Sequence, residues 1–182
     1  QSHSEISYAV FCLKKKTDLA VEIIFDASGS IEARLQGQTK LSLARRALAA
    51  AVPGLENPSI LVGMRAYGFD QSLNKTPDAS CPNTELVLPF TANRQATAIN
   101  RTADALSAYG YTPIADSLTL AGHDLLAIDA QKHMIILISD GEETCGGFPA
   151  AVAANLRSLG IDLQTHVIGF DLDATAQQQM QA

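Results

Sequence analysis

The sequence has no excess of basic residues, no apolar run long enough to cross a bilayer, and only three cysteines. Its 13 Lys and Arg stand against 19 Asp and Glu, a net charge of -6, so it lacks the basic surface that nucleic acid phosphates require. The longest apolar runs, such as "MIILI" at 134–138, are far below the roughly 20 residues that span a bilayer. The cysteines show no CxxC or Cys/His spacing suited to zinc. We therefore expect neither nucleic acid binding nor membrane insertion by this segment.

The length and composition indicate one domain. At 182 residues and 47% hydrophobic composition, the chain can bury one substantial core. We assign residues 18–182 to this domain and residues 1–17 to an N-terminal extension or a lead-in strand. The chain opens without Met or a leader-like segment, and residues 173–182 read as a helix with no Gly or Pro to end it. We therefore expect a longer parent protein and a truncated last helix.

Short apolar runs alternate with helical patterns, which predicts a parallel sheet covered by helices. The expected strands lie at 19–25, 59–68, 84–90, 133–139 and 162–170. The expected helices lie at 40–52, 94–109, 113–128 and 150–160. Because no helix separates the second and third strands, these two should form an antiparallel hairpin at one edge. The expected fold class is α/β: a Rossmann-like, doubly wound, mostly parallel sheet with one antiparallel edge strand and helices on both faces.

Oxygen-bearing side chains follow the strands at the edge where such sheets bind ligands, which is beyond the carboxyl ends of the strands. The stretch "DASGS" after the first strand supplies Asp26, Ser28 and Ser30, which lie two apart and can point the same way. Asp140 follows the fourth strand, and Thr112 precedes the third helix. Carboxylates and hydroxyls without imidazole or thiolate suit a hard divalent cation such as Mg²⁺, Mn²⁺ or Ca²⁺. Because only two of these five side chains are charged, a coordination position of the cation would remain for water or an outside carboxylate.

Each of these residues also has a structural explanation. Ser residues before a helical region, and Thr112 before Pro113, are suitable helix N-caps, and Asp140 with Gly141 can form a turn. The coincidence of five such oxygens at one edge favours the metal site. Asp116, in the first turn of its helix, is interpreted as a structural residue that complements the helix dipole.

The same residues resemble the von Willebrand factor type A (VWA) family over nearly the whole chain. In that family a DxSxS motif, a distant Thr and a distant Asp form the metal-ion-dependent adhesion site (MIDAS), and here "DASGS", "GYTPIADSL" and "LISDGEETC" supply them in the same order. The resemblance implies a complete MIDAS with Mg²⁺ as the first choice. Ser28 and Ser30 would be direct ligands, Asp26 a weak or water-mediated one, and Thr112 and Asp140 direct or water-mediated. An Asp or Glu of a partner protein would take the vacant position.

The resemblance implies a binding module and not an enzyme. Gly29, Tyr111, Glu142 and Glu143 lie next to the candidate ligands and are candidates for a partner-binding rim. The main alternative is a cation-dependent coupling subunit of an intracellular assembly that works with an ATPase. A metal-dependent phosphate-ester hydrolase is the weaker alternative, because Ser28 stands where that class needs a second acid. The GxSxG, GxGxxG and P-loop motifs are absent from the sequence.

Two cysteines lie in loops at the same edge of the expected sheet. Cys81 is in the long connection at 70–83, which is either part of the partner-binding rim or a tolerated insertion, and Cys145 follows Asp140. A disulfide would tie the two loops together beside the metal; two free thiols are the alternative. Cys12 is expected to be unpaired or to pair outside this segment.

The cysteines also bear on the compartment. A disulfide would indicate an oxidising compartment, whereas free thiols would favour the intracellular alternative. The segments "SDGEETC" and "HVIGFD" are most similar to bacterial VWA members. We therefore expect an extracytoplasmic bacterial protein, in the periplasm, on the cell surface or secreted.

Overall fold

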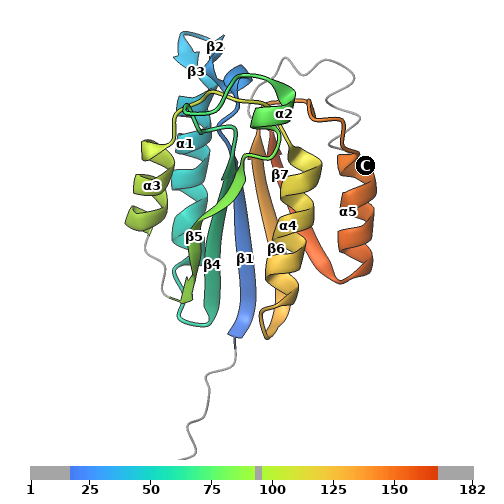
Figure 1. The fold of residues 1–182 in the computed structure, drawn as a ribbon. Coiled ribbons are helices and arrows are strands. Elements are labelled where there is room, and N and C mark those ends of the chain that lie inside the picture. Colours follow the sequence, from blue (N-terminus) through green and yellow to red (C-terminus); the bar gives the residue numbers. More distant parts are fainter. Residues whose placement is uncertain (1–16, 93–95, 168–182) are drawn as a thin grey trace, which may run out of the picture.

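A five-stranded sheet forms the centre of the computed structural model, which describes residues 17–92 and 96–167 (Figure 1). The strands are β1 (Thr17–Asp26), β4 (Ile60–Tyr67), β5 (Thr84–Ala92), β6 (Ala130–Ser139) and β7 (Ile161–Val167). Their order in the sheet is β5-β4-β1-β6-β7. All neighbouring pairs are parallel except β4 and β5, which are antiparallel. The expected fold class is confirmed, including its antiparallel edge strand.

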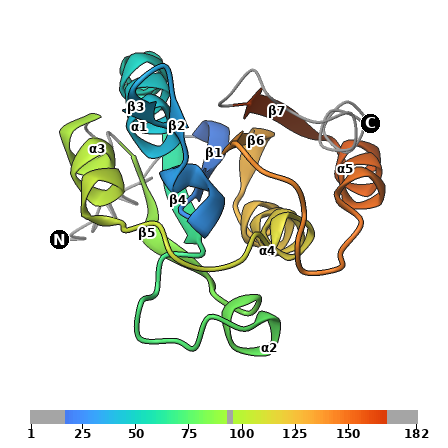
Figure 2. The same ribbon diagram turned by 90° about the horizontal axis from the view of Figure 1, so that it is seen from above.

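Helices cover both faces of this sheet (Figures 1 and 2). They are α1 (Lys40–Ala51), α3 (Ala96–Ala105), α4 (Ile114–Leu126) and α5 (Pro149–Ser158). Along β1, Ile23 and Phe25 pack in the core under α1 and α3, whereas Ala20 and Ile24 pack in the core under α4 and α5. This alternation follows from the two-residue period of a strand, and it explains why β1 is apolar on both faces. Within the described ranges, no helix has the length and hydrophobicity that crossing a membrane requires.

The helix expected at 94–109 ends early, at Ala105. The chain leaves the helix because its following backbone groups bond to the residues directly after β1 and β4. Tyr109 N donates to the carbonyl oxygens of Ala27 (3.0 Å) and Gly68 (3.1 Å), and Gly110 N donates to Gly68 O (2.7 Å). Such long-range bonds leave no periodic signal in the sequence. They bring residues 109–112 to the ends of β1 and β4.

Several short elements are additional to those expected. They are the 3₁₀ turns η1 (Gly29–Glu32) and η2 (Val52–Leu55), the hairpin of β2 (Arg34–Leu35) and β3 (Gln38–Thr39), and the helix α2 (Pro77–Ser80). The β2–β3 turn places Gln36 and Gly37 at positive φ, 49° and 85°. Elements of two to four residues are too short for a hydrophobic period to reveal them. Cys12, residues 168–170 of the last expected strand and the expected final helix lie outside the described residues.

The sheet reverses its winding between β1 and β6. The chain passes from β1 to β4 on one side and later returns to β6 on the other side of β1. Asp26 is the last residue of β1, and Asp140 directly follows β6. The register pairs Phe25 with Ile138, so these two ends lie together. Ligands of doubly wound sheets bind at such a reversal.

A buried ion cluster lies in the middle of the sheet. Glu22 of β1 is fully buried, and its Oε1 accepts a hydrogen bond of 2.9 Å from Arg65 Nε of β4. Arg65 also pairs with Asp124 of α4, at 2.5 Å between Nη2 and Oδ2. Burial raises the pKa of Glu22 to about 7, although the Arg65 guanidinium acts in the opposite direction. A charge inside a strand is costly without a partner, and Arg65 is that partner.

The raised pKa of Glu22 predicts a pH-dependent stability. Because its folded-state pKa of about 7 lies above the ordinary 4.5, the folded chain binds this proton more tightly, and the free energy of unfolding should fall as pH rises from 4.5 to 7. Linkage gives an effect of about 3 kcal/mol over that window. Urea unfolding across this pH range should show a flatter dependence in Glu22→Gln than in the wild type. The exposed Glu85→Gln serves as the control, and parallel curves for Glu22→Gln and the wild type would contradict the assignment.

Candidate metal site

Asp26 is held rigidly at the carboxyl end of β1. Its side chain is fully buried, with Oδ1 accepting from Ser28 N (2.7 Å) and Oδ2 accepting from the Ser139 hydroxyl (2.6 Å). Ser139 Oγ in turn accepts from the Tyr67 hydroxyl (3.1 Å) and from Gly141 N (3.2 Å). The carboxylate therefore has one fixed orientation, set by the ends of three adjacent strands.

The two serines of "DASGS" connect Asp26 to Asp140. Ser28 Oγ and Ser30 Oγ lie 3.0 Å apart, and Ser30 Oγ donates to Asp140 Oδ1 at 3.1 Å. Ser28 and Asp140 are buried, whereas Ser30 is exposed. The 3₁₀ turn that starts at Gly29 therefore presents one buried and one accessible hydroxyl at the same point.

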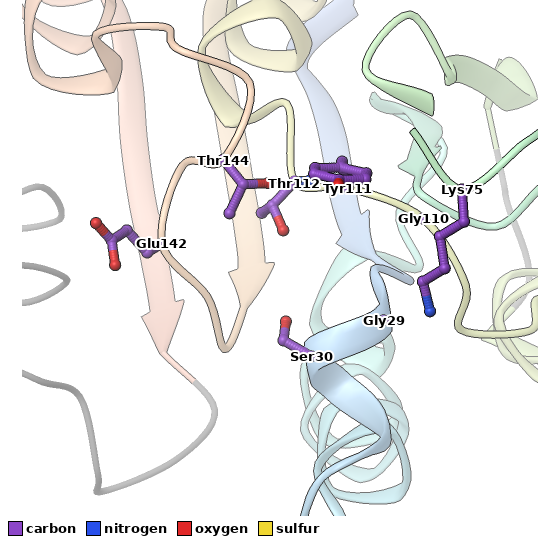
Figure 3. A pocket seen from close by; sticks show the side chains of 8 residues that line it. All are labelled: Gly29, Ser30, Lys75, Gly110, Tyr111, Thr112, Glu142 and Thr144. Atoms are coloured by element: carbon purple, nitrogen blue, oxygen red, sulfur yellow. Dashed lines mark hydrogen bonds between the residues drawn. The ribbon is translucent and has the colours of Figure 1, made fainter. Parts of the chain in front are cut away.

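Thr112 joins this group from the loop before α4. Gly141 marks the point where the side chains converge, because a Cβ placed on it would lie 3.3 Å from Ser30 Oγ, 3.7 Å from Thr112 Cγ2 and 3.8 Å from Asp26 Oδ2. Figure 3 shows the hydroxyl oxygens of Thr112 and Ser30 directed toward the same space. All five residues singled out in the sequence thus come together at one edge of the sheet.

The capping explanations for these hydroxyls are not supported. Ser28 is the N-cap of η1 but makes no side-chain capping bond, and the N-cap of α4 is Pro113, again without such a bond. Glu143 serves the start of α4 instead, since its Oε2 accepts from Ala115 N at 2.9 Å. The hydroxyls of Ser28 and Thr112 are therefore not used to begin helices. Asp116 is exposed in the first turn of α4, as its structural interpretation requires.

The electrostatics of the site favour a cation. Burial raises the pKa of Asp26, and the neighbouring Asp140 carboxylate raises it further, while hydrogen bonds from Ser139 and Ser28 act in the opposite direction. Burial also raises the pKa of Tyr67 well above its ordinary value, so this phenol remains a hydrogen-bond donor. Two buried carboxylates close together repel each other unless one of them is protonated or a positive charge is near them.

Lys40 provides part of that positive charge. It is the first residue of α1, and its Nζ lies 2.9 Å from Asp140 Oδ2. The contact has the distance of an ion pair but not the angles of a hydrogen bond, so this oxygen has no hydrogen-bond partner among the described residues. The Lys40 ammonium thus offsets the charge at Asp140 Oδ2, but this oxygen accepts no hydrogen bond from the described residues.

A cavity of about 490 Å³ opens beside these side chains (Figure 3). Its lining consists of Gly29, Ser30, Lys75, Gly110, Tyr111, Thr112, Glu142 and Thr144. Three of the four expected rim residues therefore border it. Glu142 lines the cavity with its carboxylate turned away from Ser30 in Figure 3. The fourth, Glu143, is engaged within the chain, because its carboxylate accepts from Ala115 N and Cys145 N.

The expected disulfide between Cys81 and Cys145 is present. The residue before each cysteine holds the loop that carries Thr112: Tyr111 N donates to Ser80 Oγ (2.8 Å), and Thr112 N donates to Thr144 Oγ1 (2.8 Å). Thr144 N also donates to Thr112 O (3.1 Å). The disulfide therefore ties together the two segments that position Thr112.

Four residues around the candidate ligands were not predicted from the sequence. Tyr67, Ser139 and Lys40 belong to the hydrogen bonds and ion pairs around Asp26 and Asp140, and Lys75 lines the adjacent cavity. Ser139 directly precedes Asp140, and its hydroxyl at a strand end was a usable signal. Lys40 occupies the first position of a helix, where a positive charge is unfavourable to the helix dipole and so points to another role. Tyr67 and Lys75 leave no such signal, because only the tertiary structure brings them here. Among the described residues, no three His, Cys, Asp or Glu side chains gather as a metal site, so a cation bound here would need the hydroxyls as ligands.

Two relatives resemble the chain along most of its length. It is 31% identical over 175 residues to YwmD of Bacillus subtilis (strain 168), a match that covers 93% of this chain and 76% of YwmD. It is 30% identical over 169 residues to YwmC of the same organism, covering 92% and 73%. No family model matches the chain.

Solved structures show the same fold. An aerotolerance-related membrane protein from Bacteroides fragilis NCTC 9343 superposes with a TM-score of 0.65 at 26% identity, over 83% of this chain and 68% of that one. BatB from Bacteroides thetaiotaomicron gives a TM-score of 0.63 at 22% identity, over 87% and 73%. A von Willebrand factor type A protein from Catenulispora acidiphila gives 0.64 at 19% identity, over 90% and 36%. These likenesses show a VWA-like fold.

Proposed function

The chain belongs to the same family as YwmD and YwmC of Bacillus subtilis, and we propose that it is a protein-binding module that works through a divalent cation. The observation that carries the proposal is the convergence of oxygen atoms from Asp26, Ser28, Ser30, Thr112 and Asp140. The VWA-like fold supports a role in protein interaction. In this proposal the site binds and does not catalyse, and all five side chains serve as cation ligands.

The donor set suits Mg²⁺, with Mn²⁺ or Ca²⁺ as substitutes. Every donor is oxygen, which hard cations prefer over the nitrogen and sulfur ligands of zinc and copper. Asp140 Oδ2 contacts the Lys40 ammonium but has no hydrogen-bond partner in the described part of the chain. A cation beside it would relieve the cost of burying two carboxylates.

The same charges explain why an acidic partner would bind. Asp26 and Asp140 carry two negative charges, and Lys40 already offsets one of them. A divalent cation would leave the site with a net positive charge, which a carboxylate of the partner would neutralise. Ser30 is exposed on the cavity, so a partner's Asp or Glu could reach a cation beside it.

The Cys81–Cys145 disulfide supports an extracytoplasmic location. Disulfides persist in the periplasm, at cell surfaces and in secreted proteins, and reducing systems open them in the cytosol. It speaks against the intracellular ATPase-linked alternative, which free thiols at these positions would have favoured.

Selection from a phage-displayed library of short random peptides tests the proposed function. Peptides retained by the protein in Mg²⁺ and eluted by a chelator should share an Asp or Glu. Their binding should be lost when this residue becomes Asn or Gln, and also when Ser28 and Ser30 of the protein both become Ala. Enriched peptides without an acidic residue, or with binding that the chelator leaves unchanged, would refute the proposal.

Lys40 should oppose cation binding. Its ammonium contacts Asp140, so replacing it with Met removes a like charge from beside the proposed cation. We expect Lys40→Met to bind Mg²⁺ about tenfold more tightly, since even a well-screened charge a few ångströms away is worth over 1 kcal/mol. Calorimetric titration measures this, with the exposed Lys132→Met as a charge-matched control. Unchanged or weaker binding in Lys40→Met would contradict this prediction.

A further inference from the structure

Lys75 lies at the edge that carries the candidate metal site, but the metal site does not explain its role. It lies in the connection between β4 and β5, just before α2, and its side chain is exposed and lines the cavity beside the metal site (Figure 3). The described residues contain three lysines, of which Lys40 and Lys75 are both at this edge and Lys132 is not.

The ammonium of Lys75 is held in place. Its Nζ lies 5.3 Å from the centre of the Tyr109 ring, a cation–π contact. The Tyr109 hydroxyl donates to Leu73 O at 3.0 Å, which fastens the same connection. Lys75 Nζ also lies 3.2 Å from the position that a Cβ on Gly29 would occupy. Since Gly29 stands between Ser28 and Ser30, the ammonium lies against the turn that supplies both serines.

This positive charge is available to a ligand. Lys40 pairs with Asp140, but none of the ion pairs among the described residues involves Lys75. Within the cavity lining, the carboxylate is that of Glu142, and it is turned away from Ser30. The structure thus fixes an exposed cation next to the candidate metal ligands without giving it an anion.

We propose that Lys75 is a second anchor point for a carboxylate, so that the partner is an acidic segment with two carboxylates. One would bind the cation and the other would pair with Lys75. This inference rests on the proposed function, because the first carboxylate needs the cation. The ion pair between Lys75 and the second carboxylate needs no metal. It favours partners with two acidic residues over partners with one.

A double-mutant cycle on a peptide selected in Mg²⁺ tests the proposal. The probe is the tightest Mg²⁺-dependent peptide from the library, and each of its acidic residues is replaced in turn by the amide. One replacement should abolish binding, and a second should weaken it about fivefold in the wild type but not in Lys75→Met, as expected for a single solvent-accessible pair. This difference should shrink at high salt. Lys132→Met should behave as the wild type.

Reversing the charge of Lys75 tests whether this residue binds the peptide directly or only supports the structure of the site. Lys75→Glu should bind the peptide better when its second acidic residue is replaced by Lys, a rescue that a merely structural role of Lys75 would not produce. If binding stays Mg²⁺-dependent but no acidic residue couples to Lys75, the inference is overturned while the proposed function stands. If no peptide binds in a Mg²⁺-dependent manner, the proposed function itself fails, and the inference with it.

Discussion

Replacing both Ser28 and Ser30 with alanine should abolish the stabilisation of the protein by Mg²⁺ while the fold remains intact. The fold should survive because the two hydroxyls contact each other and Asp140, and the bond from Ser28 N to Asp26 needs only the backbone. A ligand present at a hundredfold excess over its Kd stabilises the folded state by about 2.7 kcal/mol. For a domain of this size, that is a rise in Tm of roughly 5–10 °C.

Thermal unfolding with and without Mg²⁺ measures this loss. The wild type should show the rise, and the Ser28→Ala, Ser30→Ala variant should unfold at the same temperature in both conditions. The exposed Ser72 and Ser158 provide a matched control, since replacing both with alanine removes two hydroxyls that lie outside the site. A Mg²⁺-dependent rise that persists in the Ser28, Ser30 variant would show that these hydroxyls are not ligands.

Removing the disulfide should produce the largest loss of stability. The bridge spans a sequence separation of 64 residues, for which the chain-entropy relation gives about 4 kcal/mol. The Cys81→Ser, Cys145→Ser variant should therefore unfold at a much lower urea concentration than the wild type. It should also bind Mg²⁺ more weakly, because Ser80 and Thr144 hold the backbone of the Thr112 loop from both sides.

A separate variant distinguishes positioning of Thr112 from general stability. Thr144→Val keeps the disulfide but removes the oxygen that accepts from Thr112 N. It should weaken Mg²⁺ binding with a much smaller loss of stability than the double cysteine variant. Wild-type affinity for Mg²⁺ in both variants would mean that the clamp does not position a ligand.

The sequence predicted the sheet, and it predicted that five oxygen-bearing side chains lie together at one edge, because the signals for both are local. Apolar runs mark the buried strands, and a strand that ends in Asp leaves its oxygen at the edge where ligands bind. The pairing of Cys81 with Cys145 followed from the same topology, since both connections leave that edge. The pairing of Glu22 with Arg65 joins two different strands, so the sequence alone could not predict it.

The remaining features depend on contacts between segments that are distant in the sequence. Lys40 reaches Asp140 from another element, and Ser139 donates to Asp26 only because β1 and β6 are adjacent. The early end of α3 reflects backbone bonds from Tyr109 and Gly110 to other loops. Lys75 lies in the connection between β4 and β5, and no hydrophobic period in the sequence predicts the path of this connection.

Calorimetric titration of the metal-stripped protein with Mg²⁺ and Mn²⁺ tests the central claim most directly, namely that the ends of β1 and β6 hold one divalent cation. Saturable binding of one ion per chain is expected for the wild type and for Lys75→Met, and it should be absent from the Ser28→Ala, Ser30→Ala variant. No saturable heat in the wild type, or equal binding by the double serine variant, would contradict the claim.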